Sequence, residues 1–290
     1  SQICEELSRI RPEIQNRLEN AGTALLLEDD VKKPRFSFYT PGRVCAAFIH
    51  DSSAAASKWV YSHEYGRHIL ENFTDGQVRT LSYENVRTDG EVDQAVEDAV
   101  RRGANVIFTT TPKLLLSSVR QAALHPDVKI LNCSLNTSYP SVRTYYPRLY
   151  GAKFIKGAIA GTLTRDGCIG YVADYPTYGS IASINAFAQG ARMVNANARI
   201  YLDWAHLRDG GAVGRLQAQG IVYIDYLDRL AASTGTQMGN RHNLALIQTH
   251  WGRLYQSLVR RVMEGSWKQE DQGSSAVNYW WGMEQGVVSV

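Results

Sequence analysis

The chain has 290 residues, a net charge of +3, 44% hydrophobic residues and 20% charged residues. This length leaves room for one large domain or for two lobes of about 100 to 150 residues each, and the composition is typical of globular proteins and not of disordered chains. Basic residues form no concentrated run and lie mixed with acidic ones, so nucleic acid is not expected as a partner. No stretch approaches the roughly 20 consecutive apolar residues that a membrane span needs.

Residues 1–43 differ in pattern from the rest of the chain. Leu7, Ile10, Ile14 and Leu18 recur at helical spacing, and the charged, proline-containing segment KKPRFSFYTPGR follows them. We therefore expect an N-terminal helix and linker here, the leader from a region upstream.

From Val44 onward, short apolar runs alternate with amphipathic segments. The expected strands are VCAAFIH (44–50), QVRTLSYENV (77–86), NVIFTTTP (105–112) and VKILNCS (128–134). Helices are expected over 57–73, 93–103 and 114–126, and around the second of them Val92, Ala95, Val96 and Ala99 form one apolar stripe. Such alternation predicts a parallel sheet with helices on both faces.

The pattern restarts after TYYPRLYGAKFIKGAIAGTLT (144–164), a linking segment with Ala, Ile and Gly at helical spacing. Strands are expected over 168–176, 198–204 and 221–228, and helices over 181–195 and 211–220, with Ile181, Ile184, Phe187 and Ala191 on one helix face. A long helix over 244–265 and a strand-like segment over 277–290 follow. The region 219–243 is leaner than the first half, which leaves open whether the second half lacks a strand.

These elements predict an α/β fold with two doubly wound parallel-sheet lobes, a hinged clamshell. We expect lobe 1 over 44–140 with a return segment near 243–270. Lobe 2 is expected over 141–242, with the C-terminal segment 271–290 packing near the hinge.

Signals of catalysis or metal binding are weak. His63 and His68 of HEYGRH are five residues apart, whereas H-E-x-x-H places both imidazoles one helical turn apart. The segment DGGAVG (209–214) fits neither phosphate-binding glycine pattern, and no G-x-S-x-G elbow is present. No Cys-x-x-Cys pair occurs, so buried structural thiols are expected of the cysteines, which are Cys4, Cys45, Cys133 and Cys168. We expect no metal, no cofactor and no enzyme.

Ligands of open α/β sheets bind beyond the carboxyl ends of the strands. Those ends carry HDSS (50–53), TTTP (109–112), NCSLN (132–136), ADYPTYG (173–179), DWAH (203–206) and DYLD (225–228). Such groups offer hydrogen bonds and stacking surfaces, although the same residue types also cap helices and form turns. The candidate ligand-binding residues are Asp51, Ser52, Trp59, Thr110, Asn132, Tyr175, Tyr178, Asp203, Trp204, Asp225 and Trp280.

Five segments resemble the basic membrane protein (BMP, PnrA-like) family of substrate-binding proteins: VIFTTTP, YPRLYGAKFIKGAIAGTLT, IGYVADYPTYGSIASINAFAQGARMVN, HWGRLYQSLVRRVMEGSWK and VNYWWGMEQGVV. The resemblance runs from about Val44 to Val290. It implies the type I periplasmic-binding-protein fold, and several family members bind purine nucleosides for an ABC importer. Those members place G-x-x-D-D-x-S-F-N after the first strand, where only Asp51, Ser57 and Trp59 of this chain can be matched.

By this resemblance we expect a small polar, purine-nucleoside-like ligand in the interlobe cleft, an ABC permease as partner, and an extracytoplasmic, lipid-anchored protein. One alternative is a ligand-sensing regulatory module joined to an upstream domain. Free cysteines would fit its cytoplasmic location. A third hypothesis is a nucleoside-processing enzyme, for which His50, Asp51 and His206 are the acid or base candidates.

Overall fold

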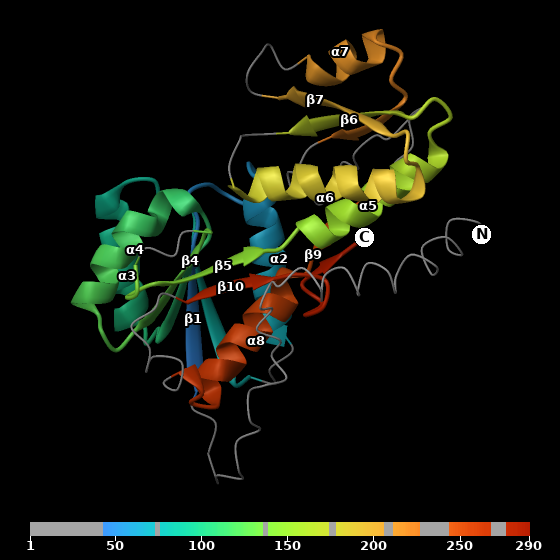
Figure 1. Cartoon of the computed structure of the whole chain (residues 1–290). Coiled ribbons are helices and arrows are strands. Elements are labelled where there is room, and N and C mark those ends of the chain that lie inside the picture. The colour runs from blue at the N-terminus through green and yellow to red at the C-terminus, as the bar shows by residue number, and fades with distance from the viewer. Residues whose placement is uncertain are drawn as a thin grey trace.

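The computed structural model describes residues 43–72, 76–135, 139–173, 178–205, 211–226, 244–267 and 277–290. Two parallel sheets with helices packed against them form two lobes, and Figure 1 shows the smaller lobe above the larger one. The expected α/β fold of two parallel-sheet lobes is confirmed. The expected N-terminal helix lies outside the described residues.

The larger lobe is built on a six-stranded sheet in the order β10-β5-β4-β3-β1-β2, and all its neighbouring strands are parallel. Its strands are β1 (Val44–Ile49), β2 (Val78–Tyr83), β3 (Val106–Thr109), β4 (Lys129–Cys133), β5 (Arg143–Pro147) and β10 (Asn278–Trp281). Its helices are α2 (Lys58–Asn72), α3 (Asp89–Arg101), the 3-10 helix η2 (Pro112–Leu114), α4 (Leu115–Leu124) and α8 (Trp251–Met263).

Both faces of this sheet are buried. In β1, Ala46 and Phe48 face a core shared with α2 and α8, while the alternate residues Ala47 and Ile49 face a core shared with α3. The predicted stripe of α3, Val92 to Ala99, lies in the second core. A strand buried on both faces needs a continuous apolar run, which VCAAFI supplies.

The smaller lobe has three described strands in the parallel order β7-β6-β8. They are β6 (Cys168–Ala173), β7 (Arg199–Trp204) and β8 (Tyr223–Tyr226), and the helices are α5 (Tyr150–Leu163), α6 (Tyr178–Val194) and α7 (Ala212–Ala218). Helices α5 and α6 lie side by side because glycines let their backbones meet. A Cβ atom at Gly157 would lie 2.0 Å from the Phe187 carbonyl oxygen, and one at Gly190 would lie 2.0 Å from that of Phe154.

Two expected helices begin later than their periodicity indicated. The segment 144–164 opens as β5, and α5 follows only from Tyr150. The segment 244–265 contains β9 (Gln248–Thr249), which pairs antiparallel with β11 (Val288–Ser289), so that α8 begins at Trp251. In both cases pairing with a distant strand overrides a local helical pattern.

The predicted face of α6 is wrong at one position. Phe187 and Ala191 are fully buried, but Ile181 is 43% exposed in the first turn of the helix.

The expected end of lobe 1 at residue 140 differs from the structure. Strands β5 and β10 both follow residue 140 in the chain, yet they belong to the larger sheet. The remaining lobe boundaries stay predictions.

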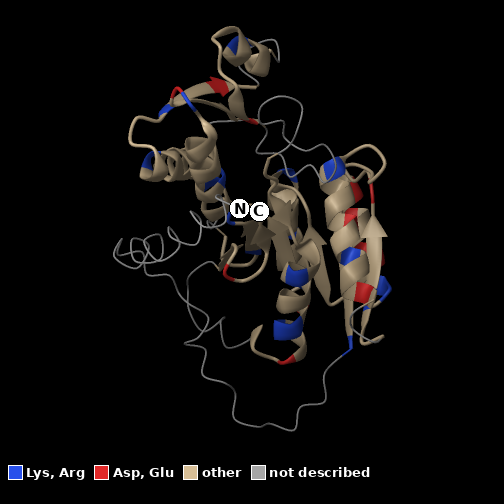
Figure 2. Cartoon of the chain, turned by 90° about the vertical axis from the view of Figure 1, so that its right-hand side faces the viewer, with Lys and Arg blue, Asp and Glu red and all other residues tan. Residues whose placement is uncertain are grey.

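Cys45 and Cys133 are buried and Cys168 is partly buried, and all three are free thiols, while Cys4 lies outside the described residues. Across the described ranges, no helix combines the length and the apolar character that crossing a membrane requires. Figure 2 shows basic and acidic residues interspersed along helices of the larger lobe.

Candidate ligand-binding site

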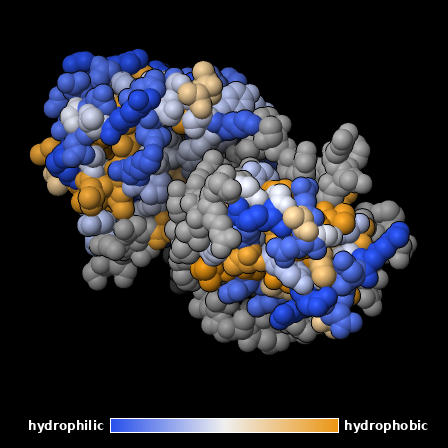
Figure 3. Space-filling model, turned by 90° about the horizontal axis from the view of Figure 1, so that it is seen from above, coloured by the Kyte–Doolittle hydropathy of each residue, from blue (hydrophilic) through white to orange (hydrophobic). Residues whose placement is uncertain are grey.

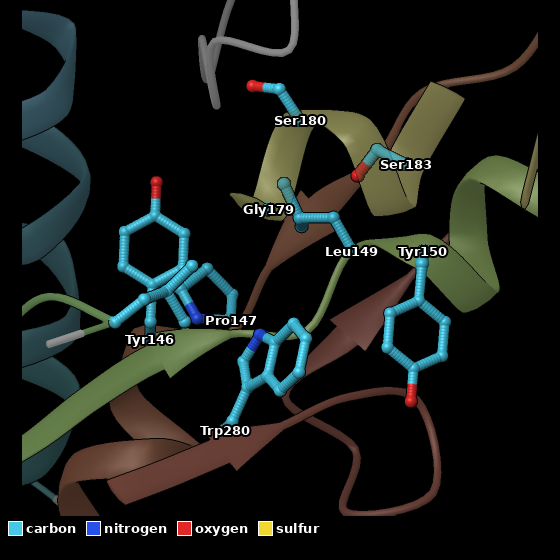
Figure 4. Close-up of a pocket in the computed structure, with 9 residues that line it drawn as sticks. Tyr146, Pro147, Leu149, Tyr150, Gly179, Ser180, Ser183 and Trp280 are labelled. Carbon is cyan, nitrogen blue, oxygen red and sulfur yellow. The ribbon is translucent and has the colours of Figure 1, made fainter. Parts of the chain in front are cut away.

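A small cavity lies where the two lobes meet (Figure 4). Its volume is about 70 Å³, enough for several ordered water molecules or a small chemical group. The lower wall comes from the ends of β5 and β10, the side wall from the connection into α5, and the upper wall from the first turns of α6. The lining residues are Leu135, Tyr146, Pro147, Leu149, Tyr150, Gly179, Ser180, Ser183 and Trp280.

Aromatic rings dominate the lower wall. The indole of Trp280 meets the Tyr150 ring edge to face, with centroids 5.5 Å apart. The Tyr146 ring lies 6.3 Å from the ring of Trp59, which reaches the same region from α2. Trp59 is fixed there because its indole N–H donates a hydrogen bond of 2.7 Å to the Thr110 carbonyl. Rings held in this way offer flat surfaces for a ligand ring.

The upper wall is the N-terminal end of α6. Backbone N–H groups at a helix N-terminus carry partial positive charge and favour hydrogen-bond acceptors or anions. Ser183 is only 4% exposed and lines the cavity. None of the described lining residues is charged, so the cavity suits an uncharged polar ligand.

A hydrogen-bond network lies at the end of β1. His50 is fully buried, and its Nδ1 lies 2.8 Å from Thr110 Oγ1 while its Nε2 lies 2.9 Å from Glu64 Oε1. Arg67 donates hydrogen bonds to the same carboxylate from two of its nitrogens, Nε and Nη2. Burial alone would raise the pKa of Glu64, but the hydrogen bonds from His50 and Arg67 lower it to about 2. The predicted binding residue Thr110 is therefore held in place from within lobe 1.

The next residues along the chain lie nearer the surface. Asp51 forms an ion pair of 3.2 Å with Lys113, and the carbonyl oxygen of Ser52 accepts a hydrogen bond of 3.3 Å from the Asn85 N–H.

The enzyme hypothesis named His50, Asp51 and His206 as acid or base candidates. Both ring nitrogens of His50 have hydrogen-bond partners inside the protein, and His206 lies outside the described residues.

The predicted acidic residues of lobe 2 are held by basic side chains. Asp225 is fully buried, pairs with Lys153 at 2.8 Å, and also pairs with Lys156. Burial would raise the pKa of Asp225, but the two lysine charges lower it to about 2. Asp203 pairs with Arg215 at 2.8 Å, and the neighbouring Trp204 packs against the α6 core.

His63 of the HEYGRH segment is buried and packs within the hydrophobic core of lobe 1. Its ring stacks on Trp251 with centroids 3.9 Å apart, and its Nδ1 is hydrogen bonded to the Tyr255 hydroxyl. Burial lowers the pKa of His63 well below its usual value, and the nearby His50 adds to this effect. Within the described residues, no cluster of His, Cys, Asp and Glu side chains could hold a metal ion.

The predicted site residues differ in how close they lie to the cavity. Trp280 lines the cavity, Trp59 and Thr110 lie at the same end of lobe 1, and Asn132 is buried near the end of β4. Tyr175 and the Tyr178 side chain lie outside the described residues. Sequence reasoning missed Tyr146, Tyr150 and Ser183, which sit in segments read only as helices. Pro147, which disfavours the interior of a helix, was the sequence signal that could have found the first two.

Known proteins share this architecture. Solved structures include a solute-binding protein of an ABC transporter system from Conexibacter woesei (TM-score 0.62, 13% identity, 85% of this chain and 87% of that one). Another is a transcriptional activator of the comK gene from Bacillus halodurans (TM-score 0.63, 16% identity, 85% of this chain and 89% of that one). At such low identity these likenesses show the fold alone.

Comparison with proteins of similar sequence identifies the family to which the chain belongs. A purine-binding protein from Brucella abortus is 25% identical over 264 residues, which span 84% of this chain and 73% of that protein. A Haloferax volcanii protein named for glucose binding by an ABC transporter is 24% identical over 265 residues, 84% of this chain and 66% of that protein, just under two thirds of its length. The Bmp family, described as ABC transporter substrate-binding protein PnrA-like, matches residues 43–234. The chain therefore belongs to the PnrA-like family of ABC transporter substrate-binding proteins, as its sequence segments predicted.

Proposed function

We propose that this chain captures a small, uncharged, ring-containing solute between its lobes and delivers it to an ABC importer. The observation that carries the proposal is the interlobe cavity, in which Tyr146, Tyr150 and Trp280 face the serines of α6. One wall comes from each lobe, so a bound solute touches both lobes and favours the closed arrangement. Membership in a substrate-binding family favours binding over catalysis.

A purine nucleoside is the ligand class that we propose first. The stacking surfaces suit a flat base, and the absence of charged groups in the described lining argues against a nucleotide. The relative from Brucella abortus is named for purine binding. The Haloferax volcanii relative is named for glucose, so sugars are the competing class.

A thermal-shift screen tests the proposal. The panel contains adenosine, inosine, guanosine, free purines, uridine, glucose and ribose. A ligand that binds only the folded state adds about 2.7 kcal/mol of stability at a concentration of 100 Kd, so the melting temperature must rise. We expect purine nucleosides to raise it and glucose to leave it unchanged. A rise with glucose alone would replace the ligand class, and no rise with any compound would contradict solute capture.

We further propose that the protein works outside the cytoplasm, as substrate-binding proteins of ABC importers do, and that it is anchored there by a lipid. Protease accessibility in intact cells that express the natural gene tests the location. The sensor alternative predicts an intracellular protein whose upstream region changes activity when the ligand is added.

A further inference from the structure

Four polar side chains form a row across the larger sheet. Strand register pairs Thr109 of β3 with Asn132 of β4, Asn132 with Thr144 of β5, and Thr144 with Asn278 of β10. Partners in register on parallel strands point to the same face of a sheet. The Thr109 hydroxyl lies 2.9 Å from the Ser118 hydroxyl of α4, so the row is on the α4 face.

The orientation of both amides follows from their partners. Asn132 Nδ2 donates to the Thr111 carbonyl at 2.9 Å, and Asn278 Nδ2 donates to Thr144 Oγ1 at 2.8 Å and to the Ser134 carbonyl at 3.4 Å. A backbone carbonyl only accepts hydrogen bonds, so the NH2 group of each amide must face it. Each Oδ1 atom therefore points the other way.

These oxygens are buried without partners. In the part of the chain that the structure describes, Asn132 Oδ1, Asn278 Oδ1 and Ser134 Oγ are closed off from solvent and make no hydrogen bond. A buried polar atom without a partner costs about 1–3 kcal/mol, so such atoms usually contact an ordered water or a ligand. The Asn278 amide reaches the Ser134 carbonyl, so two of these oxygens belong to neighbouring residues, and an ordered water or a ligand group would satisfy them.

The row lies next to the interlobe cavity. Trp280 follows Asn278 by two residues and Tyr146 follows Thr144 by two, so each cavity residue is on the same face as its row member, about 7 Å further along the strand. Leu135 directly follows Ser134 and also lines the cavity. The row members do not line the cavity themselves, but along β5 and β10 they lie two residues before those that do.

We propose that Asn132, Ser134 and Asn278 form a hydrogen-bond-accepting subsite of the ligand site. Ordered water fills it in the unliganded protein, and an N–H or O–H donor of the ligand replaces or contacts that water in the complex. Both amide oxygens only accept, and none of the three side chains is charged, so a neutral amino or amide group fits better than an anion or a metal cation. This inference rests on the proposed function for its ligand half.

A crystal structure of the unliganded chain tests the first half without any assumption about the ligand. We expect density for a water oxygen within about 3.2 Å of Asn132 Oδ1 and of Asn278 Oδ1. Well-ordered density that shows no water near either oxygen would overturn the subsite, whatever the protein transports.

Two nucleosides test the second half, because adenosine and purine riboside differ only in one exocyclic amino group. We expect wild type to bind adenosine about tenfold more tightly in titration calorimetry, the difference that one well-made hydrogen bond gives. Asn278→Leu removes the accepting oxygen and should abolish this preference. Ser118→Ala, which is on the same side of the sheet and whose hydroxyl is hydrogen bonded to Thr109 and Leu114 and not to Asn278, should keep it.

Urea unfolding first confirms that both variants are folded. Equal affinities of wild type for the two nucleosides, or a preference that survives Asn278→Leu, would overturn the subsite as a ligand contact. If wild type binds neither nucleoside, the purine assignment of the proposed function fails instead, and the crystallographic water decides the subsite alone.

Discussion

The two lobes use the polar residues at their strand ends in different ways. In lobe 2, Asp225 and Asp203 are tied to basic side chains of the same lobe. In lobe 1, Asn132 and Asn278 are positioned by their NH2 groups and keep their amide oxygens unpartnered among the described residues. Polar residues after a strand can therefore stabilise a lobe or remain ready for a ligand. Only their hydrogen-bond partners distinguish the two roles.

We therefore propose that the residues that recognise the ligand lie mainly in lobe 1 and in the connections between the lobes. Lobe 2 contributes the N-terminal end of α6, while its acidic residues hold the lobe together. Figure 3 shows hydrophobic and hydrophilic residues interspersed over the coloured surface in the view from above.

The largest expected effect is that of Asp225→Asn. Removing this carboxylate leaves Lys153 and Lys156 buried beside a neutral group, and breaking a buried pair costs about 3–5 kcal/mol of unfolding free energy. The control Asp203→Asn breaks a pair that is partly exposed and should cost about 1 kcal/mol or less. Urea denaturation of both variants measures the difference. If Asp225→Asn weakens ligand binding without loss of stability, Asp225 is a binding residue and the comparison between the lobes fails.

A smaller effect is expected where the two long helices of lobe 2 touch. Gly190→Ala forces a Cβ atom against the Phe154 carbonyl, and such overpacking costs about 1–3 kcal/mol. Gly214→Ala in α7 is the matched control, because nothing lies within 4 Å of its Cβ position and alanine favours a helix. Thermal unfolding should rank Gly190→Ala below wild type and Gly214→Ala at or above it. Equal melting temperatures for the two variants would show that α5 and α6 can separate freely.

Mild acid should destabilise lobe 1 before lobe 2. The folded state holds His63 neutral, whereas the unfolded chain protonates a histidine near pH 6.5, so unfolding binds a proton as the pH falls below that value. Between pH 6.5 and 5.5 the expected loss is about 1 kcal/mol. The pKa of Asp225 is lowered from 3.8 to about 2, so its contribution is lost only as the pH falls from about 4 toward 2. Urea unfolding of wild type and His63→Phe checks this, and an unchanged pH dependence in the variant would exclude His63 as the cause.

Much of the fold was predictable from the sequence because β1, β6 and α3 carry patterns that local physics determines. Pairing with distant strands was not predictable, which is why β5 and β9 were taken for parts of helices. Trp280 was predicted and lines the cavity. Asn278, which we propose for the subsite, was not predicted, because one asparagine within an aromatic strand carries no local signal. The ion pairs of Asp225 were also hidden, since Lys153 and Lys156 are about 70 residues away in the chain.

Solute binding between the lobes is tested most directly by titration calorimetry of wild type and Trp280→Ala with adenosine. We expect one saturable site per chain and an affinity about tenfold lower in the variant, because a stacked aromatic ring contributes about 1 kcal/mol beyond its buried area. Leu116→Ala, on the exposed face of α4, is the control and should bind as wild type does. Binding that is saturable but identical in Trp280→Ala would contradict the proposed site.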